Sequence, residues 1–340
     1  MPSPGSAAWR RGCGPAGSWW ALKKNSVWYP VAFCGVRGMQ QIGVVTATYG
    51  RQCVVQSRDG ALFRCTVRGK KSGVVCGDQV KITCSNAEQA VIEAVLPRQS
   101  LLYRADENRE KHIAANVSQV AVVIAARPNP NESLLSHCLV AAQAAGLSAL
   151  IILNKADLVA DTAALQARLA AWCTALPYPQ VILSSQDSVA IDTQLRPRLQ
   201  GQTTLFIGQS GMGKSTLINA LVPEANARTG TYSLALDSGK HTTTFAARYT
   251  LDAHSALIDS PGMQAFGLQH IKAPELALAF PEFRPYLGEC RFANCTHTHE
   301  PNCAVRAACD AGAINVWRWQ QYQQILAALV RGAARRFAML

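Results

Sequence analysis

The chain has 340 residues, of which 49% are hydrophobic and 16% charged, and its formal net charge is +12. This composition indicates a folded rather than a disordered protein, and the length allows roughly two or three domains. The positive charge favours a polyanionic partner such as nucleic acid or an anionic membrane surface. The longest apolar run, Cys138–Leu153, is interrupted by polar residues and is too short to span a membrane, so we expect no membrane segment.

Residues 1–38 contain five basic residues and no acidic residue, and they show no helical or strand period. An arginine-rich, acid-free start is typical of a transit sequence or of a basic arm that binds nucleic acid. Patterned sequence begins directly after Met39. We therefore interpret residues 1–38 as an extension and favour Met39 as the start of the protein proper.

Residues 39–98 show short alternating apolar runs separated by turn signals, among them Asp59-Gly60. Several short strands in so short a segment predict a small all-β barrel of the OB type. The basic cluster Arg68–Lys71 suits an RNA backbone, or equally a solvated turn that keeps the barrel soluble. The predicted strands are Ile42–Tyr49, Gln52–Ser57, Ala61–Arg68, Asp78–Cys84 and Gln89–Leu96.

The charged segment 99–116 is predicted to be a linker. In residues 117–273 strands and helices alternate, which predicts an α/β domain with a mostly parallel sheet covered on both faces. The predicted strands are Val120–Ala126, Ala149–Leu153, Gln180–Leu183, Thr203–Ile207 and Ala256–Ile258. The predicted helices are Ser133–Ala145, Ala163–Ala175 and Ile191–Leu199.

A glycine-rich segment after the predicted strand Thr203–Ile207 matches G-x-x-x-x-G-K-[ST] and leads into a helical pattern. A strand, a glycine-rich loop and a helix start form the context in which this motif binds nucleotide phosphates through converging backbone N–H groups. Lys214 would reach the β- and γ-phosphates, and the Ser215 hydroxyl would ligate Mg²⁺. This phosphate loop consists of Gly208, Gln209, Ser210, Gly211, Met212, Gly213, Lys214, Ser215 and Thr216.

The sequence Asn154-Lys155-Ala156-Asp157 follows another predicted buried strand, and we call it the guanine loop. The Asp157 carboxylate can accept two hydrogen bonds from guanine that adenine cannot donate, whereas Asn154 would fix the loop and the Lys155 stem would pack on the base. Ser184 and Ser185 end a further strand, and a backbone N–H there could meet the guanine oxygen. The guanine loop precedes the phosphate loop, the reverse of the order in ordinary GTPases. The chain is therefore predicted to be a circularly permuted GTPase.

Two further segments fit the switch regions of such a protein. Asp259 follows the predicted strand Ala256–Ile258 and would hold Mg²⁺ through water, while the Gly262 N–H would contact the γ-phosphate. Gly239–Thr244 is the candidate first switch, in which Thr243, or alternatively Thr242, would complete the Mg²⁺ shell.

The sequence lacks one residue that many GTPases use in catalysis. Met263 stands where many GTPases carry a glutamine that orients the attacking water, so intrinsic hydrolysis is expected to be slow. His241 is the nearest side chain able to order the water or accept its proton, alongside Lys214 and Thr243 as catalytic candidates. The alternative for His241 is an exposed switch residue without a catalytic role.

The chain has twelve cysteines, most of which we expect to be small buried hydrophobic residues. Residues 274–340 contain a dense set, Cys290, Cys295, His297 and Cys303, within fourteen residues. Three thiolates and one imidazole would close a tetrahedral structural Zn²⁺ site, although free cysteines in a helical domain are the alternative. A helix is predicted over Ile314–Leu329, with its aromatic residues in the core.

Over about Gln41–Ala328 these motifs together resemble the ribosome small-subunit-dependent GTPase family (RsgA/YjeQ). The resemblance implies an OB domain, a permuted GTPase domain and a zinc domain, with Mg²⁺ bound alongside GTP. It also implies a cytoplasmic factor that binds the small ribosomal subunit and its rRNA late in maturation, and whose hydrolysis of GTP to GDP is stimulated by the subunit and coupled to release. We expect a monomer.

Two other functions remain open at this point. One is a nucleotide-gated RNA chaperone whose hydrolysis is incidental, and the other is a P-loop enzyme that uses ATP. Residues 1–38 match nothing in the family.

Overall fold

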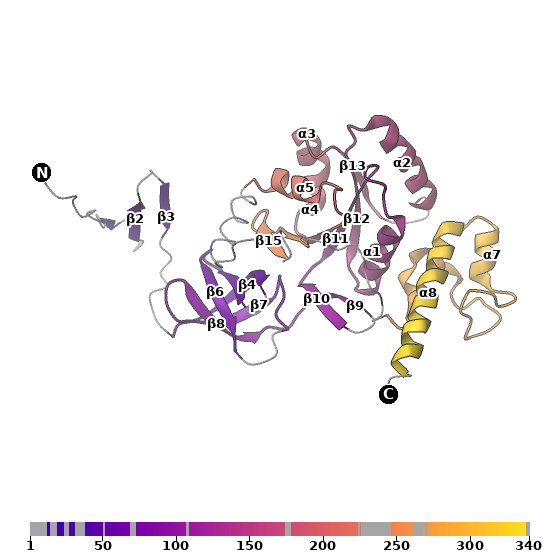
Figure 1. Ribbon diagram of the computed structural model, residues 1–340, viewed down its shortest axis with the longest axis horizontal. Coiled ribbons are helices and arrows are strands. Elements are labelled where there is room, and N and C mark those ends of the chain that lie inside the picture. Colours follow the sequence, from indigo (N-terminus) through magenta and orange to yellow (C-terminus); the bar gives the residue numbers. More distant parts are fainter. Residues whose placement is uncertain are drawn as a thin grey trace, which may run out of the picture.

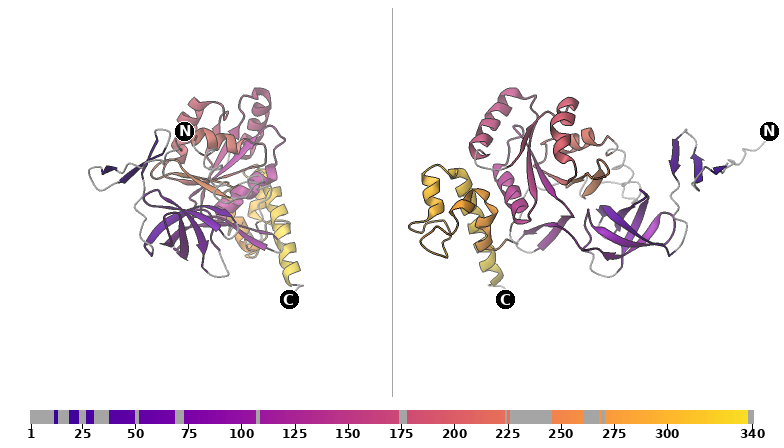
Figure 2. Two further views of the ribbon diagram at one scale, coloured as in Figure 1. Left: turned by 60° about the vertical axis from the view of Figure 1, so that its left-hand side comes forward. Right: turned by 180° about the vertical axis from the view of Figure 1, so that it is seen from behind.

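The structure is a computed structural model, and it describes residues 12–13, 19–23, 27–30, 38–49, 52–68, 73–106, 109–173, 178–223, 225, 246–260, 268 and 271–337. A β-barrel, a central α/β domain and a C-terminal helical domain follow one another along the chain. Figures 1 and 2 show the barrel and the C-terminal domain on opposite sides of the α/β domain.

Three short strands lie within residues 1–38, where the sequence shows no strand period. They are β1 (Gly12–Cys13), β2 (Trp19–Lys23) and β3 (Val27–Pro30), and they form an antiparallel sheet in the order β1-β2-β3. The strands are too short to establish a period, but tryptophan, valine and tyrosine favour extended backbone.

The barrel is closed, as the sequence predicts. Its strands pair in the order β4-β5-β6-β8-β7, and β7 pairs back onto β4. Along β6, Phe63 and Cys65 are buried while Leu62 and Arg64 are exposed, so the predicted alternation holds. The strands are β4 (Gln40–Tyr49), β5 (Gln52–Ser57), β6 (Leu62–Val67), β7 (Gln79–Cys84) and β8 (Gln89–Val95).

The segment that we predict to be a linker folds as a hairpin. Strands β9 (Leu101–Asp106) and β10 (Arg109–Ala115) pair antiparallel and lie beside the α/β domain (Figure 1). Leu102 and Ile113 are buried in the core that this hairpin shares with the α/β domain. Their burial stabilises the hairpin, a tertiary effect that the surrounding charged residues conceal in the sequence.

The α/β domain has the predicted mostly parallel sheet, in the order β13-β12-β11-β14-β16-β15. Every neighbouring pair is parallel except β15 with β16, and β15 also meets the barrel strand β4 at Ala247 and Ala47. The strands are β11 (Gln119–Ala125), β12 (Ser148–Asn154), β13 (Gln180–Ile182), β14 (Thr203–Ile207), β15 (Ala247–Thr250) and β16 (Ala256–Asp259).

Both faces of this sheet are covered. Strand β11 is buried throughout, since Val120, Val122 and Ile124 pack on one side while Ala121 and Val123 pack in a second core on the other. The helices are α1 (Glu132–Ala144), α2 (Val159–Cys173), α3 (Ser188–Ala190), the π-helical turn η1 (Ile191–Leu195), α4 (Arg196–Leu199) and α5 (Lys214–Leu221). The helix predicted over Ile191–Leu199 thus begins earlier, at Ser188, because the Asp187 side chain caps it. It is irregular near Pro197, which lacks the N–H for a regular turn.

The C-terminal domain packs on the α1 face of the sheet and shares its core. It consists of the 3₁₀ helices η2 (Ala273–Ala279) and η3 (Pro281–Tyr286) and the helices α7 (Ala304–Asp310) and α8 (Val316–Phe337). As predicted, aromatic Tyr322 of α8 is buried in that core. Among the described residues, no helix is apolar over a stretch long enough to cross a bilayer.

Candidate functional site: a guanine-nucleotide pocket and a metal loop

The phosphate loop connects β14 to α5 at the carboxyl end of the sheet, where ligands bind in such folds. Glycine is needed at two positions of this loop because neighbouring segments of the chain lie very close to its backbone. A Cβ atom at Gly208 would lie 2.3 Å from the Val123 carbonyl oxygen, and one at Gly213 would lie 2.3 Å from the Asn154 Nδ2. Gly213 also has a φ of +88°, a conformation that glycine adopts without strain. A side chain at either position would displace the loop from its neighbours Val123 and Asn154.

Lys214 lies in the first turn of α5 with its ammonium folded over the loop. Its Nζ donates to the carbonyl oxygens of Gly208 at 2.6 Å and Gln209 at 3.2 Å. Burial lowers the pKa of Lys214, and the nearby Asp259 carboxylate partly opposes that shift. A desolvated ammonium at this place is a strong electrostatic partner for a phosphate because little water screens it.

Asp259 ends β16 beside the phosphate loop. Burial raises the pKa of Asp259, although Lys214 offsets part of the effect. Its Oδ1 is buried and has no hydrogen-bond partner among the described residues. Ser215 lies in the first turn of α5 with an exposed side chain. The unpartnered Asp259 carboxylate oxygen and the Ser215 hydroxyl are both hard oxygen donors, so these residues fit a Mg²⁺ ion bound together with nucleotide phosphates.

Asn154 joins the nucleotide motifs. This buried side chain donates from Nδ2 to the Met212 carbonyl oxygen at 2.8 Å, and its Oδ1 accepts the Ser185 N–H at 2.9 Å. One amide therefore ties the guanine loop to the phosphate loop and to the loop after β13. The three segments lie together despite their permuted order in the chain.

The guanine loop is arranged to present Asp157 to solvent. The Asp157 Oδ1 accepts a hydrogen bond from the Ser184 hydroxyl at 2.7 Å, and the Ala156 N–H donates to the Leu183 carbonyl. Lys155 has a φ of +63°. The Ser185 N–H donates to the Asn154 side chain. The contact of a backbone N–H at Ser184 or Ser185 with the guanine oxygen stays a prediction.

A third loop borders these motifs, although it carries no nucleotide-binding motif of its own. Residues 127–131, here called the clamp loop, connect β11 to α1 at the same edge of the sheet. The Asn131 N–H donates to the Gln209 Oε1 at 3.0 Å, and the Lys155 Nζ donates to the Arg127 carbonyl oxygen at 2.9 Å. The available signal was an Arg-Pro-Asn-Pro-Asn sequence directly after a buried strand, since loops at this edge line the ligand site.

Five residues of the predicted switch regions lie outside the residues that the structure describes: His241, Thr242, Thr243, Gly262 and Met263. Their roles stay predictions.

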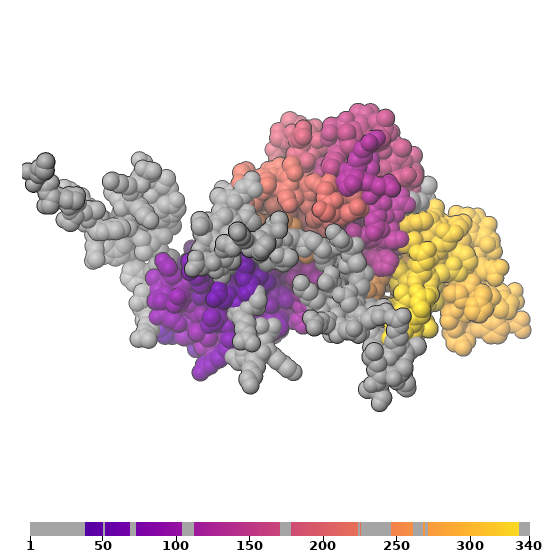
Figure 3. Space-filling model, in the orientation of Figure 1, coloured from indigo at the N-terminus to yellow at the C-terminus, as the bar shows by residue number. Residues whose placement is uncertain are grey.

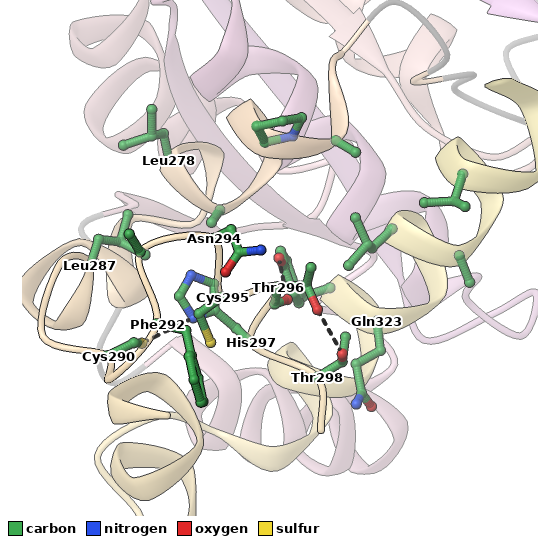
Figure 4. Close-up of a pocket in the computed structure, with 18 of the residues that line it drawn as sticks. Leu278, Leu287, Cys290, Phe292, Asn294, Cys295, Thr296, His297, Thr298 and Gln323 are labelled. Atoms are coloured by element: carbon green, nitrogen blue, oxygen red, sulfur yellow. Dashed lines mark hydrogen bonds between the residues drawn. The ribbon is translucent and has the colours of Figure 1, made fainter. Parts of the chain in front are cut away.

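The four predicted metal ligands come together in the C-terminal domain. The ligand atoms of Cys290, Cys295, His297 and Cys303 all lie within 4.8 Å of one another, and Figure 4 shows three of these side chains by label. The two thiol sulfurs of Cys290 and Cys303 are 3.9 Å apart, and each lies 3.5 Å from the His297 Nδ1. These four residues could hold a metal ion.

The spacing fits zinc. In a tetrahedral site with Zn–S and Zn–N bonds of about 2.3 and 2.05 Å, the sulfurs lie about 3.8 Å apart and each sulfur about 3.6 Å from the nitrogen. The distances between Cys290, Cys303 and His297 agree with both values. Three thiols and an imidazole also form the donor set that zinc prefers in closed structural sites.

Helix α8 holds this metal loop, residues 290–303, in place. The Trp319 Nε1 donates to the His297 carbonyl oxygen at 2.9 Å, and the Tyr322 hydroxyl donates to the Thr296 carbonyl oxygen at 2.9 Å. The same loop forms one wall of a largely apolar cavity of about 840 Å³, which α8 and η2 complete (Figure 4).

The fold and the nucleotide motifs define a circularly permuted P-loop GTPase. Residues 95–269 match the model of the RsgA GTPase family. The small ribosomal subunit biogenesis GTPase RsgA of Neisseria meningitidis is 50% identical over 275 residues, covering 81% of this chain and 88% of that protein. The protein of the same name from Bordetella pertussis is 48% identical over 288 residues, covering 84% of this chain and 96% of its own.

Solved structures agree. The crystal structure of YjeQ from Thermotoga maritima superposes with a TM-score of 0.67 at 28% identity, covering 86% of this chain and 99% of that one. YloQ, described as a circularly permuted GTPase, superposes with a TM-score of 0.64 at 24% identity and supports the fold. The chain therefore belongs to the RsgA GTPase family and is a GTP-hydrolysing enzyme.

Proposed function

We propose that this GTPase acts in the biogenesis of the small ribosomal subunit, as a cytoplasmic monomer that binds the immature subunit and its rRNA. The observation that carries this proposal is the identity of 50% and 48% to two proteins named for that process, across 88% and 96% of their lengths. This similarity covers 81% and 84% of the chain, more than the GTPase segment 95–269, and so supports a shared role rather than a shared nucleotide module.

GTP is proposed to lie across the carboxyl end of the sheet, with its base at the guanine loop and its phosphates in the phosphate loop. Asp157 would accept hydrogen bonds from the guanine ring N–H and amino group, and Lys214 would stabilise charge on the β- and γ-phosphates. The hydrogen bonds of Asn154 to both neighbouring loops support this placement, because they fix the distance between base and phosphate sites.

Ser215 and Asp259, with Thr243 from the switch, would hold the Mg²⁺ that accompanies GTP, and this ion supplies charge neutralisation at the β- and γ-phosphates. His241 is proposed to position the attacking water, since Met263 cannot. Hydrolysis would then be slow without help from a partner. The small subunit is proposed to stimulate it, with release coupled to the change from GTP to GDP.

The net charge of the chain and the arrangement of its domains support an RNA partner. The chain carries a net charge of +12, and Figure 3 shows the barrel and C-terminal domain spread to either side of the GTPase domain. Such an arrangement presents separate surfaces to a large polyanion. We propose Zn²⁺ as the ion of the metal loop, with a structural role, because four protein ligands leave no open coordination position.

The test is GTP turnover with and without purified immature small subunits, in the wild type and in Ser215→Ala. We expect subunits to raise the wild-type rate by at least about 10-fold and to leave Ser215→Ala low. A wild-type rate that subunits do not change would favour the alternative of an RNA chaperone whose hydrolysis is incidental. Subunit affinity measured with GDP and with a non-hydrolysable GTP analogue tests the coupling to release, which predicts weaker binding with GDP.

A further inference from the structure

The Gln209 side chain connects the phosphate loop to another element. Its Oε1 accepts the backbone N–H of Asn131 at 3.0 Å. Its own backbone carbonyl oxygen accepts the Lys214 Nζ at 3.2 Å and the Met212 N–H at 3.4 Å. Gln209 thus stabilises the turn of the phosphate loop through its backbone carbonyl and also contacts the side chain of Lys214, the phosphate-binding lysine.

The partner of Gln209 is rigidly held. Asn131 is the N-cap of α1, and its Oδ1 accepts the Leu134 N–H at 3.0 Å. Helix α1 is buried along most of its length, and its Ser136 hydroxyl is bonded to the buried Arg318 of α8 at 2.8 Å. An anchor on such a helix can fix a loop more precisely than another loop could.

The rest of the clamp loop contacts both nucleotide motifs. A Cβ atom at Gly211 would lie 3.3 Å from the Pro128 ring, so the loop covers that side of the phosphate loop closely. The Arg127 carbonyl oxygen receives the Lys155 Nζ at 2.9 Å. At the end of β11, the Ala125 N–H donates to the Met212 sulfur at 3.2 Å. The clamp loop therefore supports the base-binding and the phosphate-binding segments together.

We propose that the clamp loop is a wall of the guanine-nucleotide site, and that Gln209 is a positioning residue that sets nucleotide affinity by fixing the phosphate loop to the Asn131 N–H. This inference rests on the proposed placement of GTP. A phosphate loop held in its binding conformation loses less conformational freedom when nucleotide binds, so the anchor raises affinity without touching the ligand.

The test compares Gln209→Met with Gln202→Met. Methionine keeps the length of the side chain and removes the strong acceptor. Gln202 accepts the Ser118 hydroxyl at 2.6 Å at the amino end of β14, one strand length from the site, so it is a matched control. Loss of one hydrogen bond predicts that Gln209→Met binds fluorescent GDP about 3- to 10-fold more weakly, with a raised KM for GTP and an unchanged kcat. The control is expected to bind like the wild type.

The donor side gives a second test. Asn131→Pro removes the backbone N–H that donates to Gln209. In Asn131→Pro the further change Gln209→Met should no longer weaken binding, because the hydrogen bond is already absent.

Two results would overturn the inference: Gln209→Met affinity within twofold of the wild type, or weaker binding in Gln209→Met that the Asn131→Pro background leaves undiminished. A wild type that binds no guanine nucleotide would instead refute the proposed placement of GTP.

Discussion

A buried ion pair within the C-terminal domain lies where that domain packs on the GTPase domain, and its removal is expected to be costly. The Arg318 Nε lies 2.6 Å from the Glu282 Oε1, and both side chains are at most 3% exposed. Arg318 also donates to the Ser136 hydroxyl at 2.8 Å and lies over the Phe280 ring, 4.5 Å from its centre. The pair thus contacts α1, η3 and the aromatic core at once.

Arg318→Met would leave the Glu282 carboxylate buried and without its cation. Removing one partner of a buried pair is destabilising by about 3–5 kcal/mol, because the remaining charge keeps its desolvation penalty. The double variant Arg318→Met with Glu282→Leu removes both charges and should recover most of that loss. Arg196→Met is the matched control, since its ion pair with Asp192 is exposed and worth about 0.5 kcal/mol.

The assay is urea unfolding followed by near-ultraviolet circular dichroism, with GDP binding measured in parallel. Arg318→Met should unfold at clearly lower urea concentration and still bind GDP in the folded state, because Arg318 lies outside the nucleotide site. Equal losses for Arg318→Met and Arg196→Met would refute this reasoning. So would a double variant no more stable than Arg318→Met.

Three further predictions concern the two sites. Asp157→Asn should weaken GTP binding by at least about 100-fold, and xanthosine triphosphate should compete better because its C2 oxygen accepts from the new amide; unchanged GTP preference in a competition assay would count against the base placement. Gly213→Ala should abolish GDP binding in a folded protein, since its Cβ would lie 2.3 Å from the Asn154 Nδ2, and calorimetry that shows wild-type affinity would contradict this. Metal analysis should find about one zinc per chain. Cys303→Ala should lose that zinc and Cys309→Ala should retain it, whereas retention in both would exclude Cys303 as a ligand.

Much of this protein follows from sequence alone where the signal is local. The phosphate loop is predicted correctly as a strand, turn and helix start because glycine spacing and apolar period act within a few residues. Alternation places Phe63 and Cys65 inside the barrel for the same reason. The four residues of the metal loop are close in sequence, so they needed only short turns to meet.

Other features depend on contacts between distant segments, and only the tertiary structure decided them. The hairpin at Leu101–Ala115 forms because Leu102 and Ile113 find a core that is remote in sequence. Arg318 is buried because Glu282 and Ser136 meet it there, whereas an isolated arginine on an amphipathic helix is expected to face water. The clamp loop borders the phosphate loop because parallel strands end at one edge of a sheet, so residues 78 positions apart, Asn131 and Gln209, share a hydrogen bond.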